Sequence, residues 1–141
     1  MNNVKIEELK ENKLTYYISH ITRNDGLLNV LRAFIDSAGY GPDDYIELAY
    51  ADSYTEDEIN KKNGLILLAR YPLSQLASKE DLIYQMSCRY FYNRLKDNIE
   101  NTFYLKFPEL KEQVEQLLKE LFISFELDKG LEVLMESRID F

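Results

Sequence analysis

The chain has 141 residues, of which 45% are hydrophobic and 30% are charged, a composition typical of a globular protein with its own core. Its 25 acidic and 17 basic residues give a net charge of −8, which argues against a surface that neutralises nucleic-acid phosphates or anionic lipids. One cysteine excludes an internal disulfide, and the sequence has no apolar run of about 20 residues. The charged residues 1–12 lack an apolar stretch, so we expect no signal peptide. We expect one cytoplasmic domain over residues 1–141.

The first part of the chain predicts two helices and a strand. Apolar residues recur at helical spacing over residues 6–21, although β-branched and aromatic residues in the second half of this segment also allow a strand. An apolar stripe over residues 27–35 predicts a helix that Asn24 caps and Gly39 ends. Alternating apolar residues over 45–51 then predict a half-buried strand.

A continuous apolar run over residues 65–71, which Pro72 ends, predicts a second and more buried strand. The residues between the two strands are polar and acidic. We therefore expect the strands over 45–51 and 65–71 to form an antiparallel hairpin with a long acidic connection.

Two further helices are expected after the hairpin. One begins at Ser78 and carries apolar residues at helical spacing as far as Leu95. The other opens at Pro108 and ends near Gly130, and residues 131–141 allow either a short helix or a strand. The order helix, helix, hairpin, helix, helix predicts a predominantly helical α+β fold with a small antiparallel β-hairpin.

The negative charge is concentrated in residues 33–60, here called the acidic window, which contains no Lys or Arg. The acidic window holds eight acidic residues: Asp36, Asp43, Asp44, Glu47, Asp52, Glu56, Asp57 and Glu58. It also holds four tyrosines: Tyr40, Tyr45, Tyr50 and Tyr54. Outside it, 17 acidic residues are balanced by 17 basic ones. Negative charge interleaved with amphipathic rings is typical of a surface that captures a basic partner, with a solvated loop as the simpler alternative.

Signals for catalysis or cofactor binding are weaker. We expect His20 to lie at a helix end as a surface or capping residue, and Cys88 to be a small buried hydrophobe. Four carboxylates of the acidic window offer oxygen ligands for Ca²⁺ or Mg²⁺: Asp52, Glu56, Asp57 and Glu58. Their spacing does not match an EF-hand loop, and the sequence lacks a zinc motif, a phosphate-binding glycine loop and a nucleophile elbow. We expect no enzyme, no cofactor and no metal, with a metal-assisted hydrolase as the alternative.

Several short motifs resemble a known family. They are Gly26-Leu27-Leu28-Asn29-Val30-Leu31, Gly39-Tyr40-Gly41, Asp43-Asp44-Tyr45, the apolar run over residues 65–71, the start at Ser78 to Asp81, Cys88 with Tyr90-Phe91, and the acidic and apolar helix after Pro108. Over roughly residues 6–121 the chain is similar to immunity proteins of bacterial contact-dependent growth inhibition systems, in the group that neutralises ribonuclease toxins. The resemblance implies a non-enzymatic inhibitor that binds the toxin's nuclease domain and blocks its basic RNA-binding cleft.

The acidic window is our own prediction for the surface that binds such a toxin. The carboxylates would stand in for RNA phosphates, and the tyrosines would anchor the contact. The predicted charged residues are Asp43, Asp44, Asp52, Glu56, Asp57 and Glu58, and the predicted anchors are Tyr40, Tyr45 and Tyr54. The partner expected is a protein, not nucleic acid or membrane, and an adaptor for another basic protein is the alternative. The sequence leaves the oligomeric state open.

Overall fold

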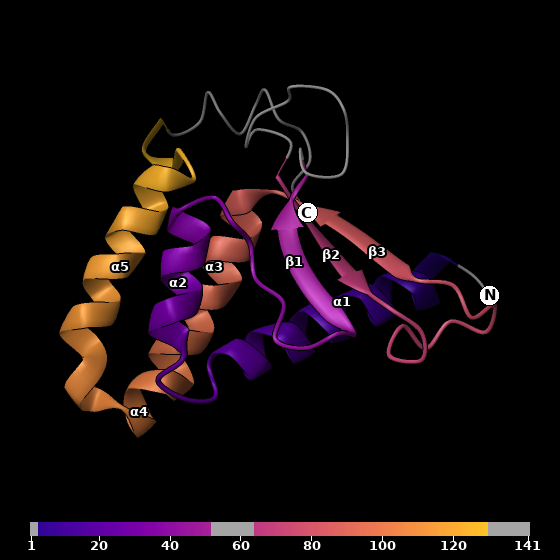
Figure 1. Cartoon of the computed structure of the whole chain (residues 1–141), viewed down its shortest axis with the longest axis horizontal. Helices are drawn as coiled ribbons and strands as arrows, with labels where there is room; N and C mark the ends of the chain where they lie inside the picture. Colours follow the sequence, from indigo (N-terminus) through magenta and orange to yellow (C-terminus); the bar gives the residue numbers. More distant parts are fainter. Residues whose placement is uncertain (1–2, 52–63, 130–141) are drawn as a thin grey trace.

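A three-stranded antiparallel sheet lies beside a group of helices in the computed structural model, which describes residues 3–51 and 64–129 (Figure 1). The longer elements are α1 (Asn3–Ile21), α2 (Leu27–Ile35), β1 (Ile46–Tyr50), β2 (Leu65–Ala69), β3 (Leu82–Met86), α3 (Cys88–Asn98) and α5 (Lys111–Ser124). A π-helical turn (Ile99–Phe103) and the short helix α4 (Tyr104–Lys106) continue α3. The fold is α+β, as the sequence predicts.

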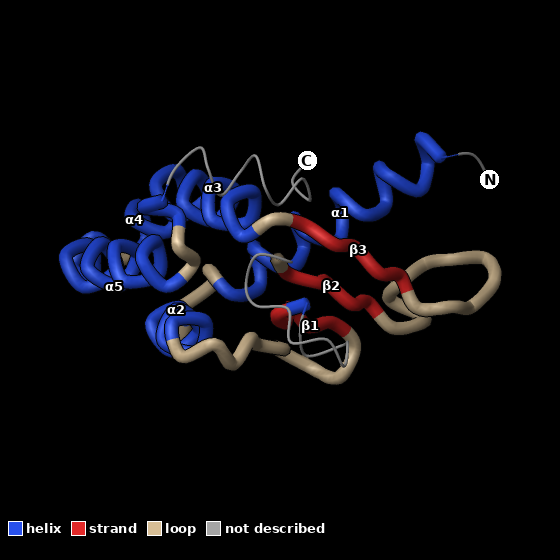
Figure 2. The backbone as a smooth tube through the Cα atoms, turned by 90° about the horizontal axis from the view of Figure 1, so that it is seen from above, coloured by secondary structure: helices blue, strands red, loops and turns tan. Residues whose placement is uncertain are grey.

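The sheet has the strand order β1-β2-β3, with both pairs antiparallel. In the register, Leu48 lies opposite Leu67 and Leu67 lies opposite Tyr84, so these three side chains share the buried face. α1 crosses one side of the sheet, behind it in Figure 1 and above it in Figure 2. The predicted hairpin is confirmed, and β3 extends it by a third strand.

Residues 82–86 are a strand, and the prediction of a helix beginning at Ser78 is wrong there. Leu82, Tyr84 and Met86 point into the core while Ile83 lies 57% exposed, the alternation of an edge strand with one buried face. The helix begins only after Ser87, whose side-chain oxygen accepts a hydrogen bond from the Tyr90 amide at 3.0 Å. Neighbouring apolar residues at the start of this segment fit both the helical and the strand period of hydrophobicity, which explains the wrong helix prediction.

The helix predicted over residues 6–21 is confirmed, and the apolar stripe over 27–35 is helical, as predicted. Its ends differ from the prediction. Asn24 accepts a hydrogen bond from the Gly26 amide at 2.8 Å, in the turn before α2, and does not bond to the helix itself. Ser37, with φ of 64°, is the left-handed residue that follows the helix, so Gly39 does not end it.

Gly39 instead lets the chain lie along the outer edge of β1. Its φ is +71°, and a Cβ at this position would be 2.8 Å from the carbonyl oxygen of Leu48. The next residue, Tyr40, exchanges two backbone hydrogen bonds with Leu48, at 2.9 and 3.0 Å. The edge of β1 is therefore partly covered by the chain's own backbone, which limits pairing with another strand there.

An aromatic cluster joins the helices to the sheet. Phe34 of α2 contacts the rings of Phe91 and Phe125, with centroid distances of 5.5 and 6.5 Å. Tyr50 of β1 packs against Phe34 at 6.3 Å and donates a hydrogen bond to the Phe34 carbonyl at 2.6 Å. Each of these side chains is buried. Because the cluster draws on α2, β1, α3 and the turn after α5, it forms the centre of the core.

The last predicted helix ends earlier than expected. Pro108 opens a 3₁₀ turn, as a proline at the first helical position favours, and α5 then runs from Lys111 to Ser124. Gly130, the predicted end, and the ambiguous segment 131–141 lie outside the described residues. Across the described part of the chain, no helix combines the length and the apolar character that crossing a bilayer requires.

Replacement of Phe34 by alanine tests the aromatic cluster. Phe34 is fully buried, so the cavity left by Phe34→Ala is expected to lower the free energy of unfolding by about 3–5 kcal/mol. Urea unfolding followed by circular dichroism measures this. Ile83→Ala, at an exposed position of β3, is the control and should change stability by less than about 0.5 kcal/mol. A loss for Phe34→Ala that is no larger than the control's would contradict the assignment of the core.

Candidate functional site

The described part of the acidic window runs from the end of α2 along the connection to β1. Asp36 follows α2, Tyr40 pairs with β1, and Asp43, Asp44 and Tyr45 precede β1. The other predicted binding residues lie outside the described residues: Asp52, Tyr54, Glu56, Asp57 and Glu58.

Backbone contacts hold the connection in place. The Tyr17 hydroxyl of α1 donates a hydrogen bond to the Tyr40 carbonyl at 2.7 Å, and the Tyr40 backbone is bonded to Leu48. One carboxylate oxygen of Asp43, Oδ1, accepts hydrogen bonds from the amides of Tyr45 and Ile46, at 2.7 and 3.1 Å. Asp43 thus starts β1 in the way an aspartate commonly supports a turn.

The acidic window contains no Lys or Arg of its own. Folding brings one basic residue to it from the neighbouring strand. The Arg70 guanidinium, just beyond β2, pairs with the Glu47 carboxylate at 2.8 Å and donates to the Asp44 carbonyl at 3.2 Å. Tertiary folding therefore brings a base to Glu47, although the sequence of the acidic window contains none. The carboxylates of Asp36, Asp43 and Asp44 remain exposed.

The tyrosines of the acidic window divide between surface and core. Tyr40 is 37% exposed and Tyr45 is 50% exposed, in keeping with their predicted place on the surface. Tyr50 is 4% exposed and belongs to the aromatic cluster, so it is not available to a partner. Two of the three predicted tyrosine anchors are thus on the described surface, and Tyr54 lies outside the described residues.

A hollow of about 360 Å³, here called the tyrosine pocket, opens beside Asp43 and Tyr45. Tyr16 of α1 and three residues of the β2–β3 connection complete it: Pro72, Leu73 and Gln75. The Tyr16 ring stacks on His20 at 5.0 Å, which places the only histidine in a ring contact at the surface. Sequence reasoning missed the four added residues, because only tertiary folding brings them to the acidic window.

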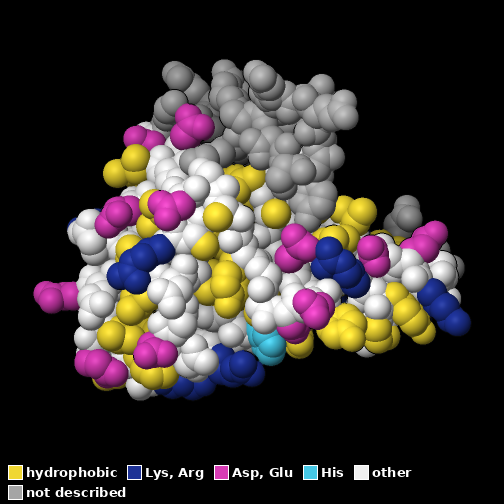
Figure 3. All heavy atoms as spheres, in the orientation of Figure 1, with side chains coloured by type: hydrophobic (Ala, Val, Ile, Leu, Met, Phe, Trp, Pro, Cys, Tyr) yellow, Lys and Arg dark blue, Asp and Glu magenta, His cyan; other side chains and the backbone are white. Residues whose placement is uncertain are grey.

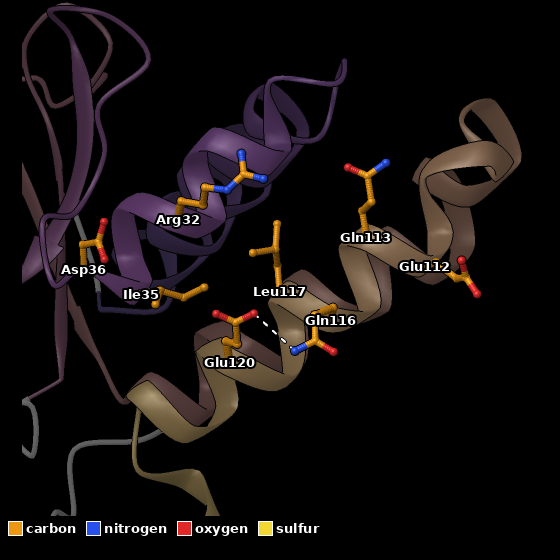
Figure 4. A pocket seen from close by; sticks show the side chains of 8 residues that line it. All are labelled: Arg32, Ile35, Asp36, Glu112, Gln113, Gln116, Leu117 and Glu120. Carbon is orange, nitrogen blue, oxygen red and sulfur yellow. Dashed lines mark hydrogen bonds between the residues drawn. The ribbon is translucent and has the colours of Figure 1, made fainter.

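A second hollow, of about 640 Å³, lies between α2 and α5, here called the helix groove (Figure 4). Figure 4 shows Asp36 and Glu112 at opposite ends, with Leu117 between them. Glu120 accepts a hydrogen bond from the Gln116 amide at 3.3 Å. The carboxylates are spread along the groove, and among residues 3–51 and 64–129 no three acidic, histidine or cysteine side chains are placed to hold a metal ion. The four ligands considered for a metal-assisted hydrolase lie outside these ranges.

Charges of both signs are visible on the face shown in Figure 3. Acidic side chains lie over the helices and over the sheet, and basic side chains lie beside them in both parts. Hydrophobic side chains, tyrosine included, lie over both parts of this face, and several lie together at its right-hand end. The surface therefore combines apolar and acidic groups and is not a uniform negative patch.

A polar network of several side chains centres on Glu11 of α1. Its carboxylate accepts hydrogen bonds from the hydroxyls of Tyr84 and Tyr90, the latter at 2.6 Å, and pairs with the Arg94 guanidinium. Arg94 also donates to the Tyr90 hydroxyl and to Thr15, each at 2.9 Å. The network connects α1 with β3 and α3 and is a structural tie, because its acceptor oxygens are already bonded.

These contacts shift the pKa values of the side chains in the network. Burial raises the pKa of the Glu11 carboxyl, but the three hydrogen bonds that it accepts and the Arg94 charge outweigh burial, so this pKa lies below its ordinary value of 4.5. Burial and the Glu11 carboxylate together raise the pKa of the Tyr84 hydroxyl well above its ordinary value. The ionised carboxylate and neutral phenol are therefore the stable pair at neutral pH.

Cys88 is the first residue of α3, and its side chain is buried, in keeping with the prediction of a small core residue.

In comparisons with protein-family models, with curated proteins and with solved structures, no match to this chain was found. The resemblance to immunity proteins therefore stays a prediction.

The Glu11 network predicts a specific loss of stability in acid. A lowered folded pKa stabilises the fold above about pH 4.5 and loses that effect as pH falls through the folded value. Between about pH 6 and pH 3, the free energy of unfolding should fall more steeply for the wild type than for Glu11→Gln. Chemical unfolding across this range measures both slopes. Glu8→Gln, at an exposed position of α1, should follow the wild type, and equal slopes for all three proteins would contradict the prediction.

Proposed function

We propose that this protein is a non-enzymatic binding protein that captures a basic partner through the connection between α2 and β1. The observation that carries the proposal is the outward display of Asp43, Asp44, Tyr40 and Tyr45 on one short segment that backbone bonds hold in place. Exposed rings on a fixed backbone lose little conformational entropy on binding. Exposed carboxylates beside them favour a cationic partner and repel an anionic one.

The class of partner comes from the family resemblance. On this proposal the protein acts in the cytoplasm as an immunity protein and neutralises a cognate nuclease toxin by covering its RNA-binding cleft. Such a cleft carries lysine and arginine side chains that hold phosphates. The carboxylates of Asp43 and Asp44 are suited to contact those side chains in the place of phosphate oxygens. The surface alone supports capture of a basic protein, and the resemblance adds that this protein is a nuclease.

Rescue of growth tests the proposed role. The partner to use is the C-terminal domain encoded by the neighbouring open reading frame, expressed under control in the same cells. We expect this domain alone to stop growth and degrade RNA, and co-expression of the full chain to restore both growth and intact RNA. Size-exclusion chromatography of the two purified proteins should show a stable complex. A toxic neighbour that the chain neither restrains nor binds would refute the role.

Neutralisation of the two aspartates tests the surface. The double variant Asp43→Asn with Asp44→Asn should slow association with that domain by about tenfold at low salt and by less at high salt. Stability should hardly change, because an asparagine at position 43 can still accept the two backbone hydrogen bonds.

The matched control removes the same charge elsewhere. Glu8→Gln with Asp25→Asn changes two exposed acids outside the acidic window. Stopped-flow or biolayer measurements at two salt concentrations compare the three proteins. An association rate for the Asp43 and Asp44 variant equal to that of the control would show that the partner docks elsewhere.

A further inference from the structure

We infer that the tyrosine pocket receives an arginine side chain of the partner. The inference rests on the proposed function, since it names the group of the basic partner that this surface holds. Three separate segments meet at the pocket: α1 with Tyr16, the residues before β1 with Asp43 and Tyr45, and the β2–β3 connection with Pro72 and Leu73. Such a convergence of apolar walls with one carboxylate is characteristic of a pocket for an amphipathic side chain.

The walls of the pocket suit the two halves of an arginine. Its planar, weakly hydrated guanidinium stacks on aromatic faces, and its aliphatic stem packs on apolar surface. Tyr16 is fixed by its stack with His20 and lies near the Lys13 ammonium, which is 5.9 Å from the ring centre. We therefore assign the stacking to Tyr45, whose side chain is the more exposed, and the packing of the stem to Pro72 and Leu73.

Asp43 supplies the charge. Because the amides of Tyr45 and Ile46 hold its Oδ1 atom, the carboxylate is oriented before a ligand arrives. A guanidinium donates strong, charge-assisted hydrogen bonds to a carboxylate, and an oriented acceptor reduces the entropy lost on binding. The nearby cation Arg70 is already paired with Glu47, so it does not neutralise Asp43 through that contact.

The size of the pocket limits the occupant. About 360 Å³ is at the small end of ligand pockets, which accommodates one long side chain rather than a helix or a nucleotide chain. A phosphate would also face the exposed carboxylates of Asp43 and Asp44. Lysine shares the charge of arginine but lacks the planar group that stacks, and leucine lacks the charge. Arginine alone satisfies both the rings and the carboxylate.

Titration with small probes tests the pocket without any partner. N-acetyl-arginine-N-methylamide is added to the full-length protein, and backbone amide shifts are followed by NMR. We expect shifts that group at Tyr45, Leu73 and Gln75, with binding about fivefold weaker or more for the lysine and leucine analogues. Equal binding of the leucine analogue, no grouped shifts, or shifts grouped at Asp36, Glu112 and Glu120 of the helix groove would overturn the inference.

Substitutions identify the groups responsible. Asp43→Asn keeps the turn acceptor but removes the charge, and Tyr45→Ala removes the stacking ring, so each should weaken arginine binding about fivefold or more. Tyr40→Ala is the matched control, because Tyr40 is an exposed tyrosine of the same connection outside the pocket lining. Arginine binding in Asp43→Asn or Tyr45→Ala as tight as in the control would overturn the inference.

Binding to the neighbouring open reading frame's domain separates this inference from the proposed function. If the wild type captures that domain and Tyr45→Ala binds it as tightly as the wild type does, the pocket is not the anchor while the proposed function stands. If the arginine probe binds at the pocket but the chain neither captures nor restrains the domain, the proposed function fails. Loss of capture in Tyr45→Ala, while the wild type captures the domain and the arginine probe binds at the pocket, supports both.

Discussion

The Glu11 carboxylate is the contact on which the arrangement of α1 depends. One side chain accepts from Tyr84 of β3 and from Tyr90 and Arg94 of α3, so α1 meets two elements that are distant from it in sequence at two oxygen atoms. The geometry places α1 across the sheet, and only in this position can Tyr17 reach the Tyr40 carbonyl and Tyr16 line the tyrosine pocket. A partly buried polar network of this kind favours one packing, because any other breaks its hydrogen bonds.

The candidate surface follows from that placement. Tyr40 is bonded through its backbone on both sides, to Tyr17 and to Leu48, which leaves its ring outside. Gly39 makes the close approach to β1 possible, since a side chain there would meet the Leu48 carbonyl. The connection between α2 and β1 thus has the rigidity of the fold without forming part of its core, a favourable condition for binding residues.

Much of the fold could be predicted from the sequence, because strong local patterns agree with it. The stripe over residues 27–35 and the alternation before Tyr50 both depend on neighbours close in the chain. The helix prediction for residues 82–86 was wrong because a short apolar segment fits a helix and a strand equally. Pairing with β2 decides for the strand. Exposure of Tyr40 and Tyr45 was predictable, whereas the tyrosine pocket was not, because Tyr16 and Pro72 approach Asp43 only through tertiary contacts.

Folding also redistributes the charge that the sequence concentrates. Arg70, just beyond β2, pairs with Glu47, and Asp36 lines the helix groove between α2 and α5. In the described residues, the negative field around Asp43 and Asp44 is consequently smaller than the count of acids in the acidic window suggests. Long-range steering scales with that field, whereas an anchor in a pocket acts at contact distance. Affinity at this surface should therefore depend more on Tyr45 and Asp43 than on the total charge of the acidic window.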